Sequence, residues 1–175
     1  AQSRYPEFAL SFYNLIPSCS FCNSILKNEK ETVLDKHIHP YMDTDAGFEF
    51  TYNFIGKDTD GKNLYGVDCN ITAVGIKDKR RVKETLELFR IKEVYNAHAG
   101  LELKDLIDLA TANPGDYIDE LVNHVLANTH LTKEDVFRIL FGVETLPNRY
   151  LNRPFSKFKM DIISKIHDII INGKK

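Results

Sequence analysis

The chain has 175 residues, of which 43% are hydrophobic and 27% are charged, and its formal net charge at pH 7 is −2. These values predict a globular protein and exclude a disordered chain. No apolar run approaches the roughly 18–20 residues that a membrane span needs, so we expect no membrane partner and a cytoplasmic location. The three cysteines favour a reducing compartment over a disulfide-linked secreted fold.

The first predicted elements are a knuckle formed by Cys19 and Cys22 and a helix that begins near Cys22. Further along, residues 48–54 alternate aromatic and polar side chains, which is the period of a half-buried strand. A turn-rich segment and a second apolar stretch follow. We therefore expect a β-hairpin over residues 48–76, with Cys69 as a buried structural thiol.

The rest of the chain has the pattern of helices. Asp78 is the expected N-cap of a helix that can run on to residue 112, with Gly100 as a possible bend. The Asn-Pro-Gly sequence at 113–115 ends it, and another helix is expected over residues 116–127.

Two further helices are predicted near the end of the chain. Thr132 and Asp135 have the spacing of a capping box, and Gly142 is suited to closing the helix that they open. The last helix is expected to start near Pro154, a residue favoured in the first helical turn.

The stretch from Ser3 to Lys27 carries the most specific pattern. Residues 3–6 read Ser-Arg-Tyr-Pro, and residues 14–24 read Asn-Leu-Ile-Pro-Ser-Cys-Ser-Phe-Cys-Asn-Ser. This run resembles the second half of an HNH (ββα-metal) nuclease module, in a bacterial branch with a C-x2-C knuckle. Members of that branch carry an Asp-His pair and another C-x2-C just before this stretch, and neither precedes it here. The resemblance implies an N-terminally truncated piece of such a nuclease.

The resemblance also assigns roles to individual residues. Asn14 would support the loop and orient the catalytic histidine, and Asn23 would occupy the metal-ligand position on the helix, with an oxygen suited to Mg²⁺ or Mn²⁺. Cys19 and Cys22 would supply two ligands of a structural zinc site. The alternatives are structural, since Asn14 also suits a turn and Asn23 a helix N-cap.

A second way to complete a zinc site involves the sequence His37-Ile-His39. Two histidines separated by one residue on a strand point to the same face, so His37 and His39 could join Cys19 and Cys22 in a Cys2His2 site. A surface or capping role for each histidine is the alternative.

Basic residues cluster in two places, around residues 77–83 and 149–165. Such clusters can contact phosphates, although they also occur on solvated helix faces. The residues predicted to contact nucleic acid are Lys27, Lys79, Arg80, Arg81 and Lys83.

Together these patterns predict an α+β fold that is mostly helical. Residues 1–76 would form a partial HNH-like module with knuckle, helix and hairpin, and residues 77–175 a helical bundle. The expected function is part of a metal-dependent DNA endonuclease that is inactive without the Asp-His general-base segment. The alternative is a non-enzymatic module with a small zinc site that binds nucleic acid or protein. DNA is the expected partner, a protein partner is possible, and the oligomeric state stays open.

Overall fold

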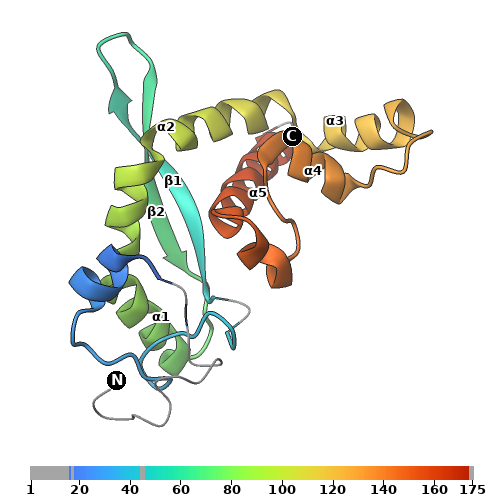
Figure 1. Cartoon of the computed structure of the whole chain (residues 1–175). Helices are drawn as coiled ribbons and strands as arrows, with labels where there is room; N and C mark the ends of the chain where they lie inside the picture. The colour runs from blue at the N-terminus through green and yellow to red at the C-terminus, as the bar shows by residue number, and fades with distance from the viewer. Residues whose placement is uncertain (1–15, 17, 44–45, 174–175) are drawn as a thin grey trace. The chain divides into compact units, whose positions relative to one another are not determined.

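In the computed structural model, residues 16, 18–43 and 46–173 are described, and at 98–101 and 169–173 only the backbone is. The fold is α+β and mostly helical, with a two-stranded antiparallel hairpin, as predicted (Figure 1). The chain forms two compact units: unit 1 holds Ala1–Gly47 and Ile71–Val94, and unit 2 holds Phe48–Asn70 and Tyr95–Lys175. In this division the hairpin is grouped with the C-terminal helices.

Unit 1 contains the π-helical turn η3 (Phe21–Lys27), a loop over residues 28–43 and the helix α1 (Ile76–Leu88). Its core is small: among its described residues, the buried ones are His37, Gly47, Val82 and Thr85. Gly47 has φ +66°, and a Cβ there would lie 2.8 Å from Cγ2 of Val82. Only glycine fits this position without displacing the helix.

The helix α1 differs from the prediction at both ends. Gly75 is its N-cap, so Asp78 lies within the first turn instead of preceding it. The helix ends at Leu88 with Phe89 as its C-cap, and Arg90 has a left-handed φ of 46°. A separate helix, α2 (Ile91–Ala112), then begins. The expected single helix with a bend at Gly100 was wrong, because the break occurs at Arg90.

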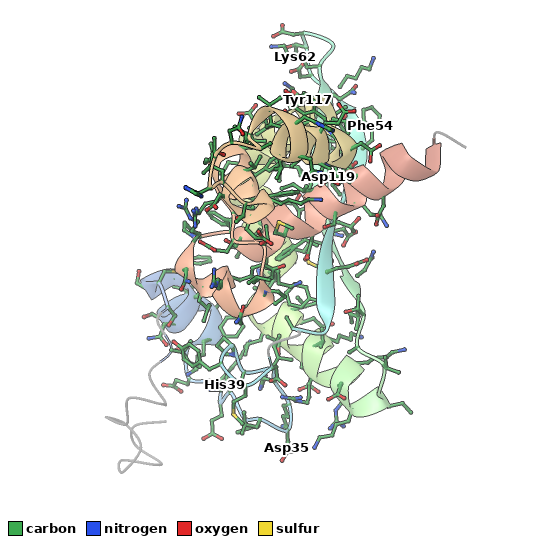
Figure 2. The ribbon with its side chains drawn as sticks, turned by 90° about the vertical axis from the view of Figure 1, so that its right-hand side faces the viewer. Asp35, His39, Phe54, Lys62, Tyr117 and Asp119 are labelled. Carbon is green, nitrogen blue, oxygen red and sulfur yellow. The ribbon has the colours of Figure 1, made fainter. Side chains whose placement is uncertain are left out.

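The hairpin of unit 2 consists of β1 (Phe48–Lys57) and β2 (Asn63–Ile71). Its turn is held by Asp58, whose Oδ1 accepts the backbone N–H groups of Asp60 and Lys62. The second strand ends at Ile71, five residues earlier than predicted, because the chain then turns into α1. Phe54 and Lys62 lie on the part of the hairpin near this turn (Figure 2).

The remaining elements of unit 2 are α3 (Gly115–Glu120), η4 (Leu121–Val125), α4 (Lys133–Phe141), η5 (Pro147–Asn152) and α5 (Ser156–Gly173). The predicted capping box is present, with Thr132 and Asp135 each accepting the other's backbone N–H. Gly142 closes α4 with a left-handed φ of 63°. The last helix begins at Ser156, two residues after Pro154.

The core of unit 2 is built where α5 packs against β1. Phe50 lies against the rings of Tyr95 and Phe158, with centroids 4.5 and 5.3 Å away. Edge-to-face and tilted contacts of this kind add to the free energy of burying the rings. The fully buried large side chains of this unit are Val67, Leu103, Ile118, Val143, Phe158, Ile162 and Ile163.

Candidate functional site

The candidate site is the Cys19–Cys22 knuckle of unit 1. The backbone N–H of Cys22 donates to Sγ of Cys19 over 3.4 Å, and the backbone N–H of Asn23 donates to the carbonyl oxygen of Cys19 over 3.0 Å. Cys19 is exposed and Cys22 is half-buried. The turn therefore presents two adjacent sulfurs, one of them directly to solvent.

The two thiols differ in acidity. Hydrogen bonds from the backbone N–H and the side chain of Cys22 hold the pKa of Cys19 below its usual value, because they stabilise the thiolate. Burial raises the pKa of Cys22, and its contact with the Cys19 sulfur raises it further. Cys19 is thus the more acidic thiol and the better metal ligand or nucleophile of the pair.

The other two predicted site residues on η3, Asn23 and Lys27, are exposed or half-buried. The side chain of Asn23 is exposed, and its backbone carbonyl accepts the N–H of Asn28, which ends the turn. Lys27 lies in the last turn and is half-buried. No residue of η3 is buried. Asn14, the other predicted catalytic asparagine, lies outside the described residues.

The two histidines of unit 1 have local roles. Nδ1 of the buried His37 accepts the backbone N–H of Val33, and Nδ1 of His39 accepts that of Tyr41, each over 3.3 Å. Both bonds fit the capping alternative. Among the described residues, no group of three or more His, Cys, Asp and Glu side chains could hold a metal ion. The described part of the chain therefore offers the knuckle as a two-ligand half-site.

Arg81 fastens the loop of residues 33–43 to α1. Its Nη2 donates to the carbonyl oxygen of His37 (3.1 Å) and to Oδ2 of Asp43 (2.9 Å), and its Nη1 reaches both Asp43 and Asp78 at 3.3 Å. Only 14% of the Arg81 side chain is exposed. His39 and Asp35 of the same loop are labelled in Figure 2. Of the predicted nucleic-acid contacts, Arg81 is thus the one committed to the interior of unit 1.

The Asp43 carboxylate is tuned by this arrangement. Partial burial tends to raise its pKa, but the backbone N–H of His39 and the guanidinium of Arg81 lower it by more. The N–H of His39 lies 2.6 Å from Oδ2 of Asp43. The carboxylate is consequently ionised and paired over the physiological range, as a structural anchor requires.

The outer face of α1 carries the remaining predicted basic contacts. Lys79, Arg80 and Lys83 are exposed. Arg80 and Lys83 each pair with a glutamate one turn on, at 3.8 Å, and the side chains of both are about two-thirds exposed. Exposed ion pairs of this kind contribute little free energy, so both cations stay available to another partner. Ile76, at the start of the same helix, is 91% exposed. The face therefore combines available positive charge with an apolar group.

The second basic stretch is largely used within unit 2. Arg153 pairs with Glu144 (3.5 Å), and Lys157 pairs with Asp161 (2.9 Å). Lys159 donates to the backbone carbonyl of Phe141. These three basic residues of the stretch therefore have partners within unit 2.

Part of the chain is similar to a curated phage protein. Protein ea31 of Escherichia phage lambda is 33% identical over 109 residues, which cover 60% of this chain and 36% of the phage protein. The chain thus spans about a third of the length of this curated relative. No family model and no solved structure matches the chain. In the described part of the chain, no helix is both long and apolar enough to cross a lipid bilayer.

Proposed function

We propose that this chain contains part of an HNH-type DNA endonuclease module that hydrolyses phosphodiester bonds with the help of a metal ion. The observation that carries the proposal is the knuckle itself. The backbone N–H of Cys22 lies 3.4 Å from Sγ of Cys19 at a tight turn, and the helical turn that follows directly exposes Asn23. This is the order of groups that the resemblance of residues 3–27 to the HNH module requires.

The residues present supply some of the ligands for the structural zinc ion and for the catalytic metal ion of such a module. Cys19 and Cys22 would hold a structural zinc ion, which needs four ligands, so two more must come from elsewhere. Asn23 offers an oxygen ligand suited to Mg²⁺ or Mn²⁺. When bound, the divalent cation stabilises the negative charge that develops on the leaving oxygen. No Asp-His pair precedes Cys19 in these 175 residues, so the proposed module has no assigned general-base histidine.

The match to a phage protein is consistent with a nuclease of a mobile element or of defence against one. The printed name of that protein states no activity, so the proposed chemistry depends on the knuckle and not on the relative.

The first experiment is elemental analysis of the purified chain beside the variant Cys19→Ser. The proposal expects no stoichiometric zinc in the chain alone, since the described residues supply half a site. Stoichiometric zinc that is lost in Cys19→Ser would mean that the site is complete within these residues. That result would favour the Cys2His2 alternative.

A cleavage assay tests the catalytic part of the proposal. Incubation of plasmid DNA with the chain and Mg²⁺ or Mn²⁺ is expected to leave the DNA intact, because the general base is missing. Robust cleavage that a chelator abolishes, and that Asn23→Ala leaves unchanged, would overturn the assigned roles.

The second candidate function is non-enzymatic binding of DNA or protein. The exposed basic face of α1 favours it, with Lys79, Arg80 and Lys83 directed to solvent. The test is the salt dependence of DNA binding for Arg80→Glu/Lys83→Glu, with Lys57→Glu/Lys62→Glu on the hairpin as the charge-matched control. Loss of two phosphate contacts reduces the slope of log K against log salt by about 2. Equal effects of both variants, or no binding at all, would leave a protein partner as the remaining reading.

A further inference from the structure

Two apolar side chains at the start of α1 are almost fully exposed. Val74 is 93% exposed and Ile76 is 91% exposed, the highest fractions among the large hydrophobic side chains of the described residues. Gly75, between them, has an extended backbone with φ −77° and ψ 149°. Side chains two residues apart in an extended segment point to the same side. Val74 and Ile76 therefore form a single apolar tip.

A stripe of positive charge begins at this tip. Three exposed cations follow Ile76 at the third, fourth and seventh positions after it: Lys79, Arg80 and Lys83. Residues with this spacing share one face of a helix. The buried residues of α1, Val82 and Thr85, lie outside this stripe. Glu84 and Glu87, which form the weak pairs described above, come further along the helix, so the cations lie between the tip and these two acids.

The other acids near the tip are turned away from it or are weakly held. A Cβ on Gly75 would lie 3.2 Å from Oδ2 of Asp78, which places this carboxylate on the side of the chain opposite the tip. There Asp78 pairs with Arg81. Lys77 pairs with Asp35 over 3.1 Å, and because both side chains are mostly exposed, this pair contributes little free energy.

A small apolar tip beside a basic stripe favours a DNA duplex over a membrane or a protein. A helix that lies in a lipid surface needs an apolar face along its length, and here that face stops at Ile76. Lysine is depleted in the cores of protein interfaces, whereas phosphates are its common partners on DNA. Apolar side chains such as Ile can enter between two base pairs from the minor groove while basic side chains hold the DNA around them.

We propose that the apolar tip inserts between two base pairs of a DNA duplex, while Lys79, Arg80 and Lys83 hold the adjacent phosphates, so that α1 bends the DNA. Steps such as TA unstack easily, whereas A-tracts are stiff, so the tip gives this face a preference for flexible steps. The inference rests on the second candidate function, DNA binding by the basic face of α1. It adds to that function the group that deforms the DNA.

The test compares two duplexes of equal length, one with a central TA step and one with an A-tract, each with a donor and an acceptor dye at its ends. The full chain is mixed with either duplex without added divalent cations, so that metal-dependent cleavage does not interfere. Energy transfer should rise with the TA duplex, because a wedge of this kind bends DNA by about 20–90°. The TA duplex should also bind several-fold more tightly in fluorescence anisotropy.

The variant Val74→Ser/Ile76→Ser removes the tip and keeps every charge. It should lose both the rise in energy transfer and the preference for the TA duplex, with the salt dependence of binding unchanged. Val125→Ser/Ile139→Ser is the matched control, because these side chains are 72% and 67% exposed and lie in unit 2. The proposal is overturned if the two double variants behave alike.

The two readouts separate this inference from the DNA binding on which it rests. Binding of both duplexes by the parent without bending overturns the role of the tip and leaves DNA binding by the basic face in place. Absence of binding to either duplex overturns both. Sedimentation of the chain with phosphatidylserine vesicles in that case would assign the face to an anionic lipid surface. None of these results bears on the proposed nuclease module, whose site is the Cys19–Cys22 knuckle.

Discussion

Asn96 on α2 pairs with both backbone polar groups of Val67 on β2. Its Oδ1 accepts the N–H of Val67 and its Nδ2 donates to the carbonyl oxygen of Val67, each over 2.8 Å. Val67 is 1% exposed, so water cannot take over these bonds. The side-chain amide thus satisfies a strand edge that has no neighbouring strand in the described sheet.

Replacing Asn96 with Ala should therefore weaken the hairpin. The change leaves a buried N–H and a buried C=O without their partner, which costs about 1–3 kcal/mol for each group that stays unsatisfied. The expected result is faster hydrogen exchange of the Val67 amide and a lower midpoint of urea unfolding. Asn63→Ala is the control, because the exposed Asn63 side chain donates to the hydroxyl of Tyr65, another side chain. Unchanged exchange at Val67 in Asn96→Ala would contradict the role given to Asn96.

Arg81 provides a second prediction, about unit 1. Arg81→Ala removes bonds to Asp43, Asp78 and the carbonyl of His37, and it leaves the half-buried Asp43 carboxylate without its cation. The expected loss of unfolding free energy is about 2 kcal/mol, since breaking a largely buried pair costs more than losing an exposed one. Arg81→Lys should restore little of it, because an ammonium group cannot reach three acceptors in the plane of a guanidinium.

The matched control for Arg81 is its neighbour on the same helix. Arg80→Ala loses one exposed pair with Glu84 at 3.8 Å and should change the free energy of unfolding by less than about 0.5 kcal/mol. Equal destabilisation by both substitutions, in chemical denaturation followed by circular dichroism, would show that Arg81 does not anchor the loop. The two variants also separate effects on folding from effects on DNA binding. Arg80→Ala is the one expected to weaken DNA binding.

The features that sequence predicted are those set by near neighbours. The hairpin follows from alternation along β1, and the capping box from two residues three apart, Thr132 and Asp135. The side chains that bond to the backbone of the strands could not be found in this way. Asn96 lies 29 residues from Val67, and Asp161 lies 111 residues from Phe50, whose N–H it accepts. No local pattern links such partners.

In the candidate site, too, local spacing could be predicted from the sequence and distant partners could not. The spacing of Cys19 and Cys22 was enough to predict adjacent thiols, because three residues define the turn. The inward role of Arg81 depends on Asp43, 38 residues earlier. One local signal was available, since Arg81 precedes the buried Val82 and lies one turn before the buried Thr85 on α1.

Asp161 predicts a pH dependence of stability in unit 2. Burial raises the pKa of its carboxyl group, although Lys157 and the N–H of Phe50 pull it down. Because the folded state binds this proton more tightly, its contribution to stability is full below the unfolded pKa of about 3.9 and is lost as pH rises through the folded pKa. Asp161→Asn does not titrate. Its free energy of unfolding relative to the parent should therefore increase as the pH is raised from about 4.

Urea unfolding at a series of pH values checks this expectation. Asp105→Asn, at an exposed position of α2, is the control for loss of one negative charge. A difference between Asp161→Asn and the parent that stays flat or falls with rising pH would refute the assigned cause.

His167 on α5 predicts the opposite trend, at higher pH. Burial lowers its pKa, and the nearby Lys133 lowers it further, while the backbone carbonyl of Asn113 acts against them. Nε2 of His167 lies 3.1 Å from that carbonyl oxygen, and the ring stacks edge-on near Phe137. The folded state therefore favours neutral histidine. Its contribution to stability is present above the unfolded pKa of about 6.5 and is lost as pH falls through the folded pKa.

The variant His167→Gln tests this trend because its amide can still donate to the carbonyl of Asn113 but does not titrate. Below about pH 6.5, the parent should lose unfolding free energy faster than His167→Gln, by about 1.4 kcal/mol for each pH unit between the two pKa values. His130→Gln, at an exposed position before α4, is the control for replacing a histidine with glutamine. If His167→Gln loses stability in acid as steeply as the parent, the acid sensitivity arises elsewhere in unit 2.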